Sequence, residues 1–116
     1  MQVKILGAPR PPLVDWEIFE GDVRAAEVVG APEAAQLRIY DVTFAPGART
    51  VWHSHTTDQV LVITAGHGIV ATEAEERAVR IGDMVIVPAG EQHWHGAQVD
   101  AEMTHLAVMT AGEDEY

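Results

Sequence analysis

The sequence contains no cysteine. This absence excludes disulfides, a thiolate nucleophile and cysteine-based zinc or iron–sulfur sites, so any metal must be bound by histidine, carboxylate or amide groups. Basic residues are also few, with 7 Lys and Arg against 18 Asp and Glu and a formal net charge of −11. Because nucleic acids and anionic membrane surfaces are bound by basic side chains, this balance argues against both kinds of partner.

Long apolar runs are missing as well. No stretch approaches the roughly 18 residues of a membrane-spanning helix, and the apolar stretch at residues 1–7 is too short for a signal peptide. We therefore expect a cytoplasmic protein. Its 47% apolar and 22% charged residues are ordinary for a globular protein. A chain of 116 residues has room for one domain with a core and one small pocket.

We predict a single domain over residues 1–116 with three regions. Residues 1–36 form an irregular N-terminal arm with a possible edge strand at 15–20, residues 37–109 form a barrel, and residues 110–116 form an acidic tail that we expect to be frayed. Short strands with turn signals about every 8 to 12 residues predict an all-β sandwich or barrel, here a jelly roll. The expected strands are 37–44, 49–55, 59–65, 69–72, 77–81, 84–87, 92–96 and 103–109, with a hairpin loop at 66–68.

The six histidines all lie between positions 53 and 105. His53 and His55 are two residues apart, as are His93 and His95, so the members of each pair point to the same face of an extended strand. Two such pairs favour a mononuclear metal site, because imidazole is a common ligand of first-row transition metals. The alternative is that one pair is surface polar alternation or a hydrogen-bonded barrel lining.

Two sequence motifs resemble those of the cupin family. Residues 47–66 have the pattern G-x5-H-x-H-x3-Q-x6-G, in which Gln59 replaces the usual Glu. Residues 82–93 have the pattern G-x5-P-x-G-x2-H, and the Asn that usually ends this motif is Ala97 here. The resemblance implies a small double-stranded β-helix barrel, a cupin jelly roll. It also implies one divalent metal ion held by His53, His55, Gln59 and His93.

A closer likeness exists to the small bacterial cupins with hydroxynitrile lyase activity. It rests on F-A-P-G-A-R-T at 44–50, W-H-x-H at 52–55, T-A-G at 64–66, H-W-H-G-A at 93–97 and M-T-H-L-A at 103–107. The likeness implies that glutamine is the fourth ligand and that the metal is manganese or iron, with zinc or nickel as further options. It also implies that His95 and His105 line the pocket.

The exchange of Glu for Gln59 has a physical consequence of its own. Three imidazoles and one amide are neutral, so a divalent ion keeps its full charge, which favours Lewis-acid chemistry over redox cycling. We therefore predict a lyase for a small hydroxylated substrate, with His105 or His95 accepting the hydroxyl proton. His95 could instead orient a ligand.

Three side chains of the first barrel strand could complete the pocket. Tyr40, Val42 and Phe44 share one strand face and are candidate substrate-pocket residues, although such a stripe is often plain core. We expect a small-molecule substrate and a homodimer or higher homo-oligomer. Two alternative functions stay open, an Fe(II)-dependent cupin dioxygenase and a non-catalytic cupin that binds a small ligand.

Overall fold

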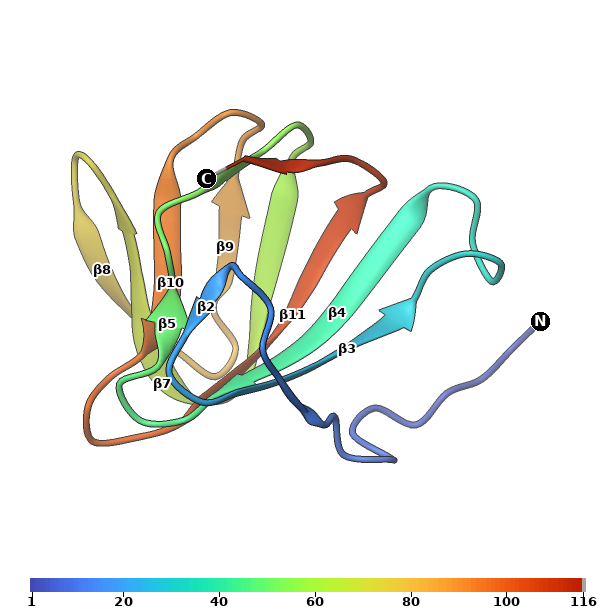
Figure 1. Ribbon diagram of the computed structural model, residues 1–116, viewed down its shortest axis with the longest axis horizontal. Coiled ribbons are helices and arrows are strands. Elements are labelled where there is room, and N and C mark those ends of the chain that lie inside the picture. Colours follow the sequence, from blue (N-terminus) through green and yellow to red (C-terminus); the bar gives the residue numbers. More distant parts are fainter. Residues whose placement is uncertain (116) are drawn as a thin grey trace.

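The computed structural model describes residues 1–115, which form β-strands joined by turns and loops, with no helix (Figure 1). None of these residues therefore belongs to a helix that could cross a membrane. Residue 116, the end of the predicted acidic tail, lies outside the described residues. The strands are β1 (Leu13–Val14), β2 (Phe19–Glu20), β3 (Val23–Val29), β4 (Leu37–Phe44), β5 (Arg49–Thr50), β6 (Ser54–His55), β7 (Gln59–Thr72), β8 (Glu76–Arg80), β9 (Met84–Val87), β10 (His93–Ala97), β11 (Met103–Thr110) and β12 (Asp114–Glu115).

The strands form two antiparallel layers that curl around a shared interior (Figure 1). One layer runs β1-β3-β4-β11-β7-β9, and the other runs β2-β5-β10-β7-β8. β6 and β12 make a separate two-stranded sheet. The structure confirms the predicted all-β jelly-roll architecture.

The long strand β7 belongs to both layers and forms a corner between them. It pairs with β11 and β9 up to Gly66, and with β10 and β8 from His67 onward. Gly66 has a φ of 69°, a left-handed value that glycine adopts without strain. The hairpin loop predicted at 66–68 is therefore wrong, because β7 continues through these residues to Thr72 and Gly66 bends the strand without reversing it.

The N-terminal arm is more regular than the sequence predicted. Residues 23–29 form β3, a full member of the sheet, and the edge strand expected at 15–20 is reduced to the two-residue β2. Val23 and Ala25 of β3 are buried in the core. The pattern escaped prediction because alanine has a low strand propensity and its small side chain makes the alternation weak.

Two more expectations for strands need correction. The strand predicted at 49–55 is divided into β5 and β6, because the backbone between them bonds to other segments: Val51 to Ile18 and His53 to His93. The acidic tail is not frayed over its described part, since β12 pairs with β6. Its backbone also bonds Thr56, whose amide donates to the carbonyl oxygen of Glu113 over 3.0 Å.

The apolar core fills the end of the barrel where β3 begins and β4 ends. Its largest fully buried side chains include Phe44, Ile63 and Met103, packed between the two layers. The histidines predicted to bind metal or to act in catalysis are also buried; His95 and His105 pack on Phe44 of this cluster, and His53, His55 and His93 lie at β6 and the start of β10. The barrel therefore has an apolar end and a polar interior site.

The corner in β7 yields a test of the packing. A Cβ added at Gly68 would overlap the carbonyl oxygen of Gly96 and crowd the sulfur of Met103. We expect Gly68→Ala to lower the free energy of unfolding by about 3 kcal/mol, the upper part of the range for overpacked interiors. The matched control is Gly30→Ala, where the three atoms nearest to an added Cβ all belong to the flexible side chain of Glu27. It should cost less than about 1 kcal/mol, and urea denaturation measures both; equal losses would contradict the packing.

Candidate metal centre

The backbone brings the two histidine-bearing segments together. The amide of His53 donates to the carbonyl oxygen of His93, and the amide of His93 donates to that of His53, each over 2.9 Å. Their imidazole ring centroids lie 4.2 Å apart. Because His55 follows two residues after His53, its ring reaches the same point, with its centroid 4.8 Å from that of His53.

Hydrogen bonds fix the tautomer of each of these three histidines. Nδ1 of His53 lies 2.8 Å from the carbonyl oxygen of Val51, and Nδ1 of His93 lies 2.9 Å from that of Glu91. Nδ1 of His55 lies 2.8 Å from a carboxylate oxygen of Asp114. Since these oxygens only accept hydrogen bonds, each Nδ1 carries the proton and each Nε2 of a neutral ring is bare.

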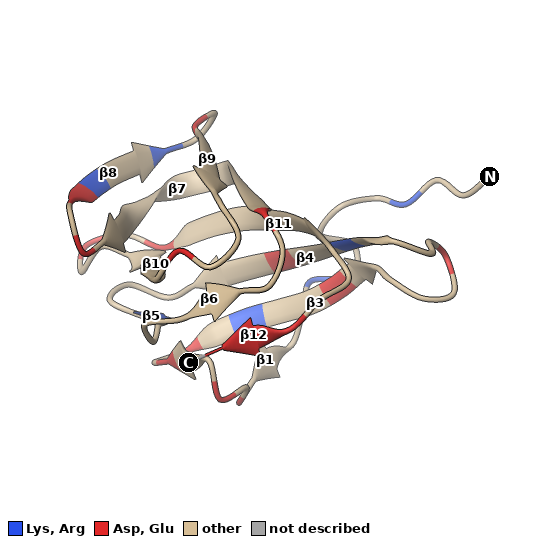
Figure 2. Ribbon diagram, turned by 90° about the horizontal axis from the view of Figure 1, so that it is seen from above, with Lys and Arg blue, Asp and Glu red and all other residues tan. Residues whose placement is uncertain are grey.

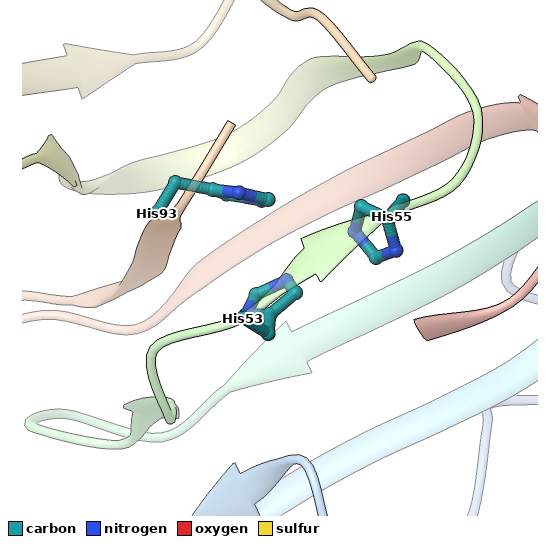
Figure 3. Close-up of side chains that lie close together, drawn as sticks. All are labelled: His53, His55 and His93. Atoms are coloured by element: carbon teal, nitrogen blue, oxygen red, sulfur yellow. The ribbon is translucent and has the colours of Figure 1, made fainter. Parts of the chain in front are cut away.

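The three bare nitrogens converge. Ring nitrogens of His53, His55 and His93, one from each, lie within 4.8 Å of one another, and Figure 3 shows the three rings gathered around a common space. Ligand nitrogens about 2.1 Å from one ion lie about 3 Å apart on adjacent positions and at most about 4.2 Å apart on opposite positions. Side-chain adjustments of about 1 to 2 Å therefore bring all three onto one ion.

Unsatisfied polar atoms concentrate at this point of the molecule. Among residues 1–115, seven buried side-chain nitrogen or oxygen atoms lack a hydrogen-bond partner, and all but Asp41 Oδ1 belong to five histidines and Gln59. They are Nε2 of His53, His55, His93 and His95, Nδ1 of His105 and Oε1 of Gln59. Buried polar groups are normally paired. Three imine nitrogens and an amide oxygen are suitable donors for a divalent transition metal, so the residues present fit such an ion.

Burial keeps the rings of His53 and His93 neutral. It lowers the pKa of His53 to about 4, with the neighbouring His93 as the next cause. Burial likewise lowers the pKa of His93. The hydrogen bond from His55 is the main cause that lowers the pKa of Asp114. Near pH 7 His53 and His93 therefore offer lone pairs rather than protons.

His95 and His105 form a second, directly bonded pair beside the cluster. His105 Nε2 and His95 Nδ1 lie 3.0 Å apart, and both rings rest on the buried ring of Phe44, at centroid distances of 5.4 and 5.8 Å. Burial lowers the pKa of both histidines, that of His105 to about 4. With one proton shared between the two facing nitrogens, one of the two outer nitrogens is always bare and the other always carries a proton.

A cavity of about 520 Å³ opens onto both histidine groups. Tyr40 and Val42 line it as the sequence predicts, but Phe44 does not, because it lies in the core beneath the His95–His105 pair. The metal-site side chains that line the cavity are His53, His55 and Gln59. His93 does not line this cavity; it lines a separate cavity of about 320 Å³.

Other cavity residues were missed by the sequence analysis. From the N-terminal arm come Trp16, Ile18 and Phe19, from β11 come Ala107 and Met109, and from the chain end come Thr110, Ala111, Gly112 and Asp114. Strand alternation from His105 could have identified the β11 pair, since both share its parity. No local pattern marks the other two groups, because their position depends on how the arm and the tail fold back.

Comparison with known proteins assigns the family. Residues 40–109 match the family described as Cupin domain. The chain belongs to the cupin family. This result confirms the resemblance indicated by the two sequence motifs.

Proteins similar to this chain carry the names of different activities. An (R)-mandelonitrile lyase from Granulicella tundricola is 44% identical over 95 residues, which cover 81% of this chain and 71% of that protein. An acireductone dioxygenase from Bacillus thuringiensis is 30% identical over 66 residues, which cover 53% of this chain and 39% of that protein. The crystal structure of a cupin-like protein from Thermotoga maritima superposes with a TM-score of 0.86 at 35% identity, covering 92% of this chain and 84% of that one.

The buried histidines make stability pH-dependent in the metal-free protein. The pKa of His105 is about 4 in the folded chain, against an ordinary 6.5. Between these values the unfolded chain binds the proton and the folded chain does not, so stability falls as pH drops from 6.5 to 4. We expect His105→Gln to remove about 3 kcal/mol of that fall. Urea unfolding of both proteins across this range measures it; parallel curves would contradict the buried neutral ring.

Proposed function

We propose that this cupin is a metal-dependent lyase that cleaves 2-hydroxynitriles into an aldehyde and hydrogen cyanide. The observation that carries the proposal is one cavity lined by three of the four buried donor groups, those of His53, His55 and Gln59, and by the buried His95–His105 pair. The 44% identity to an (R)-mandelonitrile lyase supports this choice of substrate class.

The proposed metal ligands are His53 Nε2, His55 Nε2, His93 Nε2 and Gln59 Oε1, and the proposed metals are manganese or iron, with zinc or nickel as alternatives. A divalent cation held there would supply Lewis acidity, which lowers the pKa of a bound hydroxyl group. None of the four ligands carries a negative charge that would weaken this effect. The neutral set favours acid–base chemistry over a change of oxidation state.

The His95–His105 pair is suited to move the proton in this reaction. The bare outer nitrogen accepts the hydroxyl proton of the substrate. As the carbonyl forms, the bond between the carbinol carbon and the nitrile carbon breaks and its electron pair leaves with cyanide. The protonated pair then donates a proton to cyanide, so the enzyme returns to its starting state. The proton taken and the proton given can use opposite ends of the pair.

The low basicity of this pair sets a condition on the substrate. A base with a pKa of about 4 takes a proton only from a strongly acidified hydroxyl group. The pair would therefore not deprotonate an ordinary alcohol, and a divalent cation held by the proposed ligands would supply the acidification that this base needs. The resulting imidazolium is a good acid because burial disfavours its charge, and it passes the proton on to cyanide rapidly.

The apolar wall of the cavity would hold the rest of the substrate. Trp16 stacks on Phe19 at a centroid distance of 5.7 Å and meets Tyr40 edge-on at 6.3 Å. Together with Val42, these side chains give the cavity an apolar part of its lining. Such a wall binds an apolar substituent and excludes water from the reacting carbon.

Cleavage of racemic mandelonitrile by the manganese-loaded protein tests the proposal. Benzaldehyde, followed by its absorbance, should form in the wild type and more slowly in His105→Ala and His95→Ala. We expect the rate to fall by roughly 10²- to 10⁴-fold in each, the usual worth of general acid–base catalysis. The matched control, His67→Ala, removes a histidine that does not line the cavity and should keep the wild-type rate.

Metal content is measured on every variant, so that loss of metal is separated from loss of a proton carrier. No aldehyde above the metal-free background would contradict the lyase proposal for this substrate class. Wild-type rates in both histidine variants would contradict only the role of the pair.

A dioxygenase is the second candidate, and the similarity to an acireductone dioxygenase favours it. Oxygen separates the two functions. The lyase should work equally well without oxygen and with manganese, whereas a dioxygenase stops when oxygen is removed. Aldehyde formation that requires oxygen would favour the dioxygenase. Substrate binding with no turnover under either condition would favour a non-catalytic binding cupin.

A further inference from the structure

The end of the chain folds back against β6, the strand that carries the proposed ligand His55 and directly follows His53. After β11, the amide of Ala111 donates to the carbonyl oxygen of Gln36 over 2.8 Å, and β12 then pairs with β6. The amide of Glu113 also donates to Thr56 Oγ1 over 2.9 Å. Figure 2 shows β12 as an acidic strand beside β6. The segment 110–115 is therefore fixed in place and forms part of the cavity wall.

One side chain of this segment touches the metal centre. Asp114 lies opposite His55 in the β12–β6 pair, and its Oδ1 accepts the hydrogen bond from His55 Nδ1 over 2.8 Å. His53 and His93 donate instead to backbone carbonyl groups. A carboxylate is a stronger acceptor than a carbonyl group, and it raises the basicity of the opposite ring nitrogen. His55 is therefore the most electron-rich of the three rings.

The charge of Asp114 has a second consequence. The four proposed ligands leave the two positive charges of an ion uncompensated inside the barrel. Of the side chains that line the cavity, only Glu27 and Asp114 are acidic. Glu27 accepts a hydrogen bond from the hydroxyl of Tyr40 over 3.1 Å, whereas Asp114 lies one hydrogen bond behind a ligand. Its carboxylate can offset part of the charge without occupying a coordination position.

We propose that Asp114 is a positioning residue of the metal centre. It holds His55 in the tautomer whose Nε2 is bare, and it supplies from outside the ligand set the negative charge that Gln59 does not. The inference rests on the metal centre of the proposed function, but not on the reaction. It makes metal affinity depend on the segment 110–115, which the sequence analysis predicted to be a frayed acidic tail.

The Kd for Mn²⁺ in the full-length protein, at fixed pH and without substrate, tests this inference. Competition with a chelating dye measures it in Asp114→Ala, in Asp114→Asn and in the matched control Glu115→Gln. The control removes the same charge one residue away, from a side chain with no bond to His55. We expect Asp114→Ala to weaken Mn²⁺ binding 10- to 100-fold. The Kd of Asp114→Asn should lie between those of Asp114→Ala and the wild type, because the amide oxygen of asparagine still accepts the hydrogen bond from His55. The Kd of the control should stay within twofold of the wild-type value.

A second readout follows the ring itself. ¹⁵N NMR of the metal-free protein should show His55 as the Nδ1–H tautomer in the wild type and as a tautomer mixture in Asp114→Ala. Circular dichroism confirms that the variants fold. An alanine variant that binds Mn²⁺ within twofold of the control, or whose His55 tautomer is unchanged, would overturn the inference. Neither readout involves substrate. If the Mn²⁺ affinities are as expected but the protein has no lyase activity, the proposed reaction is rejected and the role of Asp114 is not.

Discussion

Four buried lone pairs that have neither a proton nor a partner impose the main constraint on this fold. Nε2 of His53, His55 and His93 and Oε1 of Gln59 are hidden from water and unbonded. Each such atom costs roughly 1–3 kcal/mol when nothing binds it. The strand pairing, the hydrogen bonds at each Nδ1 and the return of the chain end all serve to hold these atoms together. A cation that binds these atoms would remove this cost, which favours its binding.

Charge is distributed around this centre in a consistent way. The proposed ligands are neutral, and so is the His95–His105 pair beside them, because burial keeps its pKa low. A negative charge is held on Asp114, which accepts a hydrogen bond from His55. An ion held by the proposed ligands would keep most of its charge, and the carboxylate of Asp114 would offset part of it without being a ligand.

The sequence predicted what repeats at short range and missed what depends on long-range folding. Strands at 37–44 and 84–87 match β4 and β9, and the two histidine pairs do face common points, because alternation along a strand is local. Phe44 was wrongly predicted to line the pocket. Alternation along a strand shows which face a side chain is on, but not whether that part of the face lines a cavity or packs in the core. Asp114 could not be found, because nothing in an acidic tail reveals that it returns to His55. The predicted homo-oligomer and the absence of nucleic-acid partners stay predictions.

Anomalous X-ray diffraction from crystals of the manganese-loaded protein, collected above and below the manganese edge, tests the central claim most directly. The account predicts a single manganese peak per chain, with His53, His55 and His93 bound through Nε2 and Gln59 through its amide oxygen. A peak elsewhere, or a ring bound through Nδ1, would contradict it, as would loaded crystals whose four donor atoms have no metal between them.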